Sequence, residues 1–173
     1  MKDISKTCCF TGHRPEKCKS SASDVRARLE QEIRKAIADG YDTFISGMSP
    51  GVDTWAAEEV LKIRKENSTV RLLCYVPYEG VEMDWTLDAQ IEFREILDRA
   101  DEIKYICPKH ESWCFKATDT WMVEASSRVI AVFNGVPGGT EFTIRYATMM
   151  HRDVVIIEET PGQKTDKKPD DSP

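Results

Sequence analysis

The stretch VIAVFNGVPGGTEFTIRYA, residues 129–147, decides the fold. It opens with a short apolar run, Val129 to Phe133, which is typical of a strand buried on both faces. Regular structure then breaks between Asn134 and Thr140, where glycine and proline gather. After Thr140 the apolar residues follow a helical spacing that would cover a neighbouring sheet; they are Phe142, Ile144, Tyr146 and Ala147. The stretch therefore predicts a strand, a glycine-rich turn and a helix.

A turn of this kind is suited to binding an anion. Gly138 and Gly139 would let backbone N–H groups approach a ligand closely, and a helix that begins near Thr140 would offer unpaired donors at its positive end. The alternative is an ordinary strand-to-helix turn in which glycine only allows tight packing. The turn alone does not decide between these interpretations.

Size and composition predict one globular domain. The chain has 173 residues, of which 40% are hydrophobic and 31% charged, so it can bury a core of its own. No apolar run approaches the roughly 20 residues that span a bilayer, and the start, MKDISKTCCF, lacks the pattern of a signal peptide. We therefore expect a cytoplasmic protein with no membrane partner.

Charge and cysteine spacing limit the partners. A net charge of −6 makes nucleic acid an unexpected partner, because nucleic-acid binding needs a clustered basic face, but it leaves room for a small phosphorylated ligand. The six cysteines show no spacing typical of a metal site, so no metal and no cofactor are expected. Cys74 and Cys107 lie in apolar runs and are interpreted as reduced core thiols.

The first strand is predicted at Ile4 to Phe10 and ends in the sequence TGHRP, residues 11–15. Gly12 permits a sharp turn after Thr11, and Pro15 fixes the exit, which would display His13 and Arg14 at the carboxyl end of the strand. Arg14 could then bind phosphate with two hydrogen bonds. The alternative is an arginine in solvent and a histidine that bonds only to the backbone.

A second glycine-rich turn follows the strand predicted at Tyr41 to Ile45. It contains Ser46, Gly47, Met48, Gly51 and Asp53, and a helix is expected from Thr54. Asp53 would stand near the start of this helix. It could cap the helix, or it could contact a sugar hydroxyl or a catalytic water.

The remaining elements alternate between strands and helices. Strands are predicted at 70–76, 103–106 and 154–157; helices are predicted after a cap at Ser23 or Asp24, at 87–100 and at 117–126, and a loop at 108–115. The helix at 87–100 would bury Leu87, Ile91, Phe93, Ile96 and Leu97. Residues 1–157 would form the domain. The polar segment 158–173 is expected to be a disordered tail.

This alternation predicts an α/β fold with three layers, α/β/α, and a mostly parallel sheet. In such sheets ligands bind outside the carboxyl ends of the strands, where connections diverge to opposite faces. All three breaks fall at such ends, so we expect one pocket. Its candidate ligand-binding residues are Thr11, Gly12, His13, Arg14, Ser46, Gly47, Met48, Gly51, Asp53, Asn134, Gly138, Gly139 and Thr140.

The three segments TGHRP, SGMSPGVDTWAAE and NGVPGGTEFTIRYA, in this order, resemble the SLOG superfamily. This superfamily includes the DNA-processing protein DprA, the LOG phosphoribohydrolases and the YpsA-like proteins, and the resemblance is greatest to the YpsA-like branch. It covers residues 4–157 and implies a Rossmann-like fold that binds a nucleotide or a nucleotide-derived ligand. The dimeric LOG and DprA proteins imply a homo-oligomer, most simply a dimer.

The same resemblance raises the question of catalysis. LOG proteins cleave the N-glycosidic bond of a nucleoside monophosphate, and their PGGxGTxxE pattern places a Glu where this chain has Thr143. LOG proteins also carry an Arg-Lys pair on the preceding helix, and YpsA-like relatives carry Arg-Asn near the place of Thr118 and Asp119. This chain has neither pair. The remaining candidate acids are Glu141, Glu124 and Asp53.

Three hypotheses follow. The first is a module that binds a nucleotide-derived small molecule as a sensor or regulator, with phosphate on the turns at 138–140 and 47–53 and Arg14 as the counter-cation. The second is a LOG-like hydrolase that uses Glu141 or Glu124, and it alone would release free base and ribose 5-phosphate. The third is DprA-like binding of single-stranded DNA, which the acidic charge balance disfavours.

Overall fold

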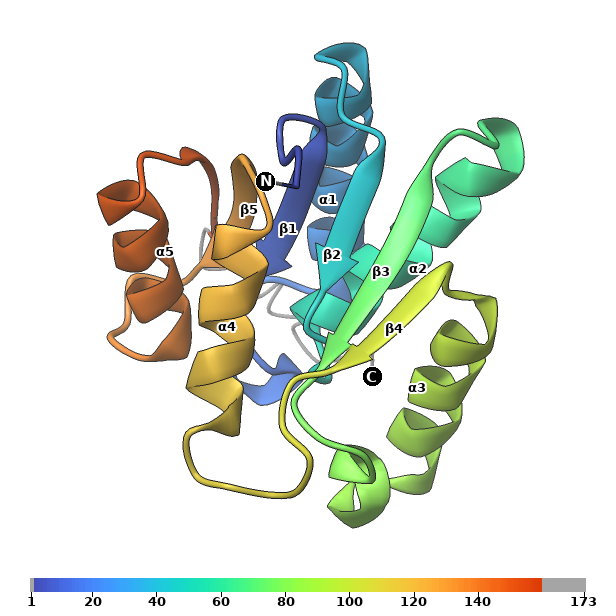
Figure 1. Cartoon of the computed structure of the whole chain (residues 1–173), viewed down its shortest axis with the longest axis vertical. Helices are drawn as coiled ribbons and strands as arrows, with labels where there is room; N and C mark the ends of the chain where they lie inside the picture. Colours follow the sequence, from blue (N-terminus) through green and yellow to red (C-terminus); the bar gives the residue numbers. More distant parts are fainter. Residues whose placement is uncertain (1, 160–173) are drawn as a thin grey trace, which may run out of the picture.

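The computed structural model describes residues 2–159 as six parallel strands and five α-helices (Figure 1). The strands are β1 (Thr7–Thr11), β2 (Thr43–Ser46), β3 (Arg71–Val76), β4 (Glu102–Tyr105), β5 (Arg128–Phe133) and β6 (Asp153–Glu158). The helices are α1 (Ala22–Ala38), α2 (Val52–Glu66), α3 (Leu87–Arg99), α4 (Cys114–Glu124) and α5 (Gly139–Met149). Short 3-10 turns lie at Pro15–Lys17 and Val81–Asp84.

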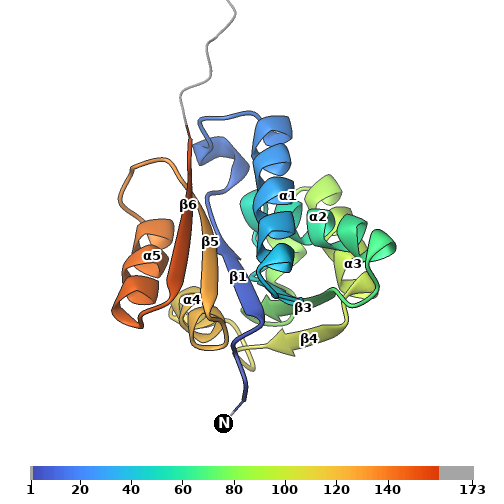
Figure 2. The same cartoon turned by 90° about the horizontal axis from the view of Figure 1, so that it is seen from above.

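The strands form one sheet in the order β4-β3-β2-β1-β5-β6, and every neighbouring pair is parallel. Helices α1, α2 and α3 lie on one side of the sheet, and α4 and α5 lie on the other (Figure 2). The predicted three-layer α/β/α fold with a parallel sheet is thus confirmed. None of the helices between residues 2 and 159 is both long and apolar enough to cross a bilayer.

Two cores follow from the alternation of side chains along each strand. Cys8 and Phe10 of β1 belong to the core beneath α1–α3, whereas Cys9 between them belongs to the core beneath α4 and α5. Cys74 and Cys107 are buried free thiols, as predicted.

The chain reverses direction in the sheet beside β1. From β1 it moves outward to β2, β3 and β4 through α1, α2 and α3; α4 then returns on the opposite face to β5, on the other side of β1. The connections that leave β1 and β5 therefore run to opposite faces. This arrangement opens a crevice at the carboxyl ends of these two strands.

Several predicted boundaries were wrong. Helix α1 is capped by Ser21, whose hydroxyl accepts a hydrogen bond from the N–H of Asp24, and not by Ser23 or Asp24. Helix α4 begins at Cys114, so its first two residues lie in the predicted loop. Strand β6 includes Glu158, one residue past its predicted end, and Glu159 is buried. The rest of the predicted tail lies outside the described residues.

The predicted core face of α3 was also wrong in part. Phe93 and Ile96 are buried, but Leu87 is 70% exposed and Ile91 is 47% exposed. Helix α3 is the last helix of its layer, so the side that faces away from α2 has no neighbouring helix in the described chain. In α5 the buried residues are Thr140, Thr143 and Ala147, and the predicted Phe142, Ile144 and Tyr146 are only partly covered.

Candidate functional site

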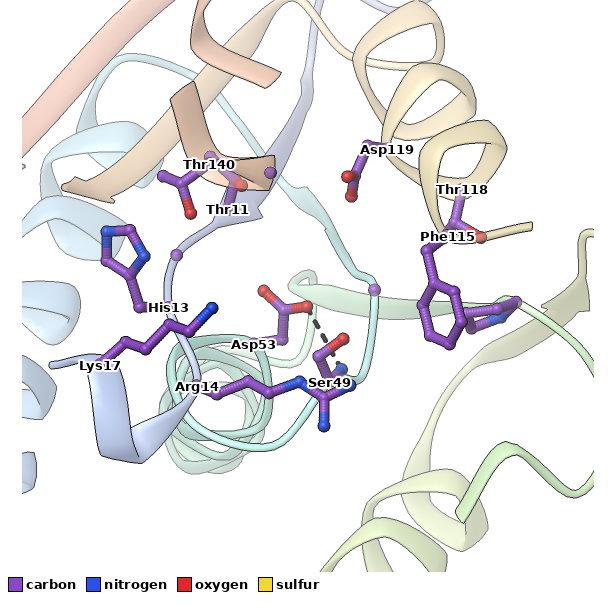
Figure 3. Close-up of a pocket in the computed structure, with 14 residues that line it drawn as sticks. Thr11, His13, Arg14, Lys17, Ser49, Asp53, Phe115, Thr118, Asp119 and Thr140 are labelled. Atoms are coloured by element: carbon purple, nitrogen blue, oxygen red, sulfur yellow. Dashed lines mark hydrogen bonds between the residues drawn. The ribbon is translucent and has the colours of Figure 1, made fainter. Parts of the chain in front are cut away.

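A cavity of about 210 Å³ lies at the carboxyl end of the sheet (Figure 3). The turns after β1 and β2, the end of β3, helix α4 and the start of α5 all contribute to its wall. The lining residues are Thr11, Gly12, His13, Arg14, Lys17, Gly47, Ser49, Asp53, Pro77, Phe115, Thr118, Asp119, Gly139 and Thr140.

The turn after β1 packs tightly on the start of α2. A Cβ atom at Gly12 would lie 2.4 Å from the side chain of Val52, so only glycine fits here without displacing the helix. The N–H of Val52 donates to the carbonyl of His13 at 3.3 Å. This contact fixes the turn against α2 and keeps the next residues at the cavity.

His13 joins the turn after β1 to the end of β5. Its Nε2 atom accepts a hydrogen bond of 3.1 Å from the N–H of Asn134, and its ring stacks on Phe133 with centroids 6.1 Å apart. Burial lowers the pKa of His13 below its ordinary value. An imidazole that accepts at Nε2 is neutral and carries its proton on Nδ1.

Two cations border the cavity. Arg14 and Lys17 line it, and within residues 2–159 neither side chain forms a hydrogen bond or a salt bridge. Long cationic side chains on a protein surface usually pair with acids or remain in solvent. Both side chains line the cavity, so an anion bound there could pair with them.

The turn after β2 has a constrained backbone. Met48 and Gly51 have φ angles of 61° and 98°, and a Cβ at Gly51 would lie 2.6 Å from the carbonyl oxygen of His13. The hydroxyl of Ser46 donates to the carbonyl of Asp53 at 2.8 Å and accepts from the N–H of Met48. These contacts shape the turn and hold the start of α2 in place.

Asp53 projects from the first turn of α2 into the cavity and is only 8% exposed. One carboxyl oxygen, Oδ2, accepts a hydrogen bond of 3.2 Å from the N–H of Ser49. Burial and the neighbouring Asp119 raise the pKa of Asp53 to about 8, and the hydrogen bond from Ser49 and the charge of Arg14 oppose this shift in part.

Asp119 enters the same cavity from α4 (Figure 3). Burial raises its pKa to about 7, and the nearby hydroxyl of Thr143 on α5 partly offsets the shift. Two carboxyls with raised pKa values in one cavity are a common mark of a functional site. The sequence placed Asp119 on a predicted helix and at a position where relatives carry Arg-Asn, but it gave no signal that this carboxyl faces the cavity.

The start of α5 opens directly into the cavity. Phe142 is the first residue of α5 whose N–H bonds to a helical carbonyl, that of Gly138, so the N–H groups of residues 139–141 have no helical acceptor. No side chain caps this end. No atom lies within 4 Å of a Cβ placed on Gly138 or Gly139. The alternative that these glycines serve tight packing therefore has no support in the structure.

The cavity contains eight of the predicted ligand-binding residues: Thr11, Gly12, His13, Arg14, Gly47, Asp53, Gly139 and Thr140. The other five, Ser46, Met48, Gly51, Asn134 and Gly138, lie in the same turns but do not line it. The amide of Asn134, for example, donates to the carbonyl of Lys17 and holds the 3-10 turn. Sequence reasoning missed Lys17, Ser49, Pro77, Phe115, Thr118 and Asp119.

Two of the three candidate acids lie away from the cavity. The carboxylate of Glu124, at the last turn of α4, accepts a hydrogen bond of 2.7 Å from the hydroxyl of Tyr146. Glu141 lines a separate groove along α5 with Phe142 and Met149. Helical rotation turns both side chains away from the cavity wall, so only Asp53 of the predicted acids is placed for chemistry there.

Comparison with known sequences agrees with this arrangement. The sequence model of YpsA, described as the YspA SLOG family, matches residues 8–154. The chain belongs to the YpsA branch of the SLOG proteins. UPF0398 proteins of Bacillus cereus (strain G9842) and Bacillus thuringiensis (strain Al Hakam) are each 26% identical to it over 151 residues, which cover 82% of this chain and 82% of each relative.

Solved DprA structures share the fold of this YpsA-family chain. DprA of Streptococcus pneumoniae matches with a TM-score of 0.64 and 17% identity, over 94% of this chain and 52% of that protein. DprA of Helicobacter pylori, which binds single-stranded DNA, matches with a TM-score of 0.61 and 13% identity, over 88% of this chain and 65% of that protein. The chain thus spans about half the length of the pneumococcal protein, and at these identities the likeness concerns the fold alone.

Proposed function

We propose that this protein binds a nucleotide or a nucleotide-derived small molecule in the cavity, as a sensor or regulatory protein. The observation that carries the proposal is the open start of α5, where free N–H groups and Gly139 border a cavity that is also lined by Arg14 and Lys17. A phosphate there would accept from the helix amides and pair with the two cations.

Hydroxyl groups of a sugar would be recognised next to this anion site. Asp53 and Asp119 line the cavity beside the cations, and the hydroxyls of Thr11 and Thr140 form no hydrogen bond within the described residues. These two hydroxyls are therefore available to a ligand. A sugar phosphate would supply both an anion and hydroxyls, which fits membership of the SLOG proteins.

The proposal is tested by the thermal stability of the purified protein with AMP, GMP, ADP, NAD and ADP-ribose. A ligand that binds only the folded state raises the unfolding midpoint through mass action. We expect at least one of these compounds to raise the midpoint in a concentration-dependent manner. No rise with any of them would contradict the proposal, and the glycine-rich turns would then be structural.

A second candidate function is hydrolysis of the N-glycosidic bond of a nucleoside monophosphate. It is favoured by the two carboxyls in one cavity, because such hydrolysis uses one carboxyl as the acid and a second as a carboxylate base or nucleophile. Glu141 and Glu124 have no place in this scheme. Asp119, which lies beside Thr143, would supply the carboxylate from α4, with Asp53 as its partner. Release of free base and ribose 5-phosphate from AMP or GMP would establish hydrolysis.

A further inference from the structure

Phe115 lines the cavity but does not take part in core packing. Its side chain is 37% exposed and belongs to neither of the two cores. Tyr78, which packs against the core beneath α1–α3, holds the ring through an edge contact with centroids 6.1 Å apart and planes at 84°. A large apolar ring that is positioned in this way, yet left open to a polar cavity, is suited to contact with a ligand.

The cavity is chemically divided. Figure 3 shows Thr140, His13 and Lys17 on one side of it, Phe115 on the opposite side, and Asp53 between them, with the guanidinium of Arg14 beside Ser49. The start of α5, with its free amides, lies on the side of Thr140, and Pro77 adds a second apolar side chain to the lining of the cavity. A ligand that matches this order has an anion at one end, hydroxyl groups in the middle and a flat apolar ring at the other end.

The size of the cavity limits the ligand further. Sites for drug-sized ligands have volumes of about 300–1,000 Å³, whereas this cavity has about 210 Å³. The cavity is therefore better suited to a small ligand than to a dinucleotide such as NAD. A mononucleotide presents phosphate, ribose and base in the order of the wall chemistry.

We propose that Phe115 is the stacking surface for the nucleobase of a mononucleotide whose phosphate lies at the start of α5. This inference rests on the nucleotide-binding function proposed above. Stacking on an aromatic side chain accepts any base, because every base has a π-face. We therefore expect Phe115 to favour nucleotides over sugar phosphates and to discriminate little between adenine and guanine.

The test compares AMP with ribose 5-phosphate, which lacks the base, by calorimetry on the wild-type protein and on Phe115→Ala. Removal of an aromatic stacking partner weakens nucleotide binding by roughly 5- to 150-fold. We expect a loss of this size for AMP and a change of less than about 2-fold for ribose 5-phosphate, which does not reach Phe115. Phe115→Trp should retain AMP binding, whereas Phe115→Leu should not. Trp113→Ala, which removes a more exposed ring (56%) outside the cavity, is the matched control.

The possible failures are distinguishable. Equal wild-type affinities for AMP and ribose 5-phosphate, or equal losses of both in Phe115→Ala, would overturn the role of Phe115 and leave the phosphate site intact. If the wild-type protein binds neither compound, the proposed function fails and the inference fails with it. Binding of a 5′-phosphorylated oligonucleotide without binding of AMP would overturn the assignment to a free mononucleotide.

Discussion

The Nε2 atom of His13 accepts a hydrogen bond of 3.1 Å from the backbone N–H of Asn134. This bond crosses the point where the sheet changes direction and ties the turn after β1 to the end of β5. His13 therefore has a structural task that its position in the sequence did not reveal. It aligns the two turns that we propose to hold the ligand.

Protonation of His13 should break this hydrogen bond, so the stability of the folded protein should depend on pH. The pKa of His13 is lowered in the folded state, so its contribution to stability is present above the unfolded pKa of about 6.5 and is lost as the pH falls through the folded value. His13→Ala should lower the free energy of unfolding by about 1–3 kcal/mol at pH 8, because the N–H of Asn134 is left without its partner. The difference between the two proteins should shrink as the pH falls below about 6.

Chemical denaturation across this pH range measures the effect. His151→Asn is the matched control, because His151 is exposed and its φ of 57° suits asparagine. An unchanged difference between wild-type protein and His13→Ala at every pH would show that the protonation state of His13 does not matter for the fold.

The titration of Asp119 should change the stability of the protein with pH in the opposite direction to that of His13. Its folded pKa is raised to about 7, so the folded state binds more protons than the unfolded state between about pH 4 and 7, and stability falls as the pH rises through this window. Asp119→Asn removes the buried charge and also the effect of Asp119 on Asp53. The variant should be more stable than the wild-type protein at pH 8 by at least about 1 kcal/mol, the equivalent of about one pKa unit.

The wild-type protein and Asp119→Asn should have nearly equal stability at pH 4, where Asp119 of the folded wild-type protein is protonated and uncharged. Asp98→Asn, at an exposed position of α3, should show no such pH dependence and serves as the control. A variant Asp119→Asn that is less stable at pH 8 would mean that the carboxylate makes favourable contacts in the folded protein.

Much of the fold could be predicted from the sequence, because alternation of strands and helices and the position of glycine-rich turns depend on local patterns. The order of the strands in the sheet could not be predicted in this way. It brings α4 across the sheet to the cavity, so Phe115 and Asp119 join residues that are more than 60 positions away in the chain. Glu124 was selected for its residue type, but the rotation of α4 points it at Tyr146 instead.

The glycines of the site should differ in their tolerance of a side chain. Gly12→Ala places a Cβ 2.4 Å from Val52 and should lower the free energy of unfolding by about 1–3 kcal/mol. Gly139→Ala meets no atom within 4 Å and lies in a helix, so stability should be unchanged or slightly higher. Denaturation curves of the two variants measure this contrast, and a strongly destabilised Gly139→Ala would show that this glycine is structural.

Gly139→Asp should retain the fold and abolish nucleotide binding, because it places an anion where the phosphate is proposed to lie. Binding is measured by the thermal shift with the ligand that stabilises the wild-type protein, with Gly139→Ala as the control for side-chain volume. Undiminished nucleotide binding by a folded Gly139→Asp variant would show that the phosphate does not bind at the start of α5.

Arg14 should contribute directly to affinity. Its guanidinium has no hydrogen-bonded partner within the described residues and lines the cavity, so Arg14→Ala should weaken nucleotide binding by about 1–3 kcal/mol without loss of stability. Arg145→Ala, on the exposed side of α5 away from the cavity, should bind as the wild-type protein does. Equal affinities of Arg14→Ala and wild-type protein would show that Arg14 is a solvated loop residue.

Binding of a nucleotide phosphate at the start of α5 is tested most directly by a titration of the ¹⁵N-labelled protein with AMP, followed through its backbone amide resonances. We expect the amides of Gly139, Thr140 and Glu141 to shift most and to saturate together with those of the turn after β1. Saturable shifts elsewhere, with these three amides unmoved, would contradict binding of phosphate at this helix start.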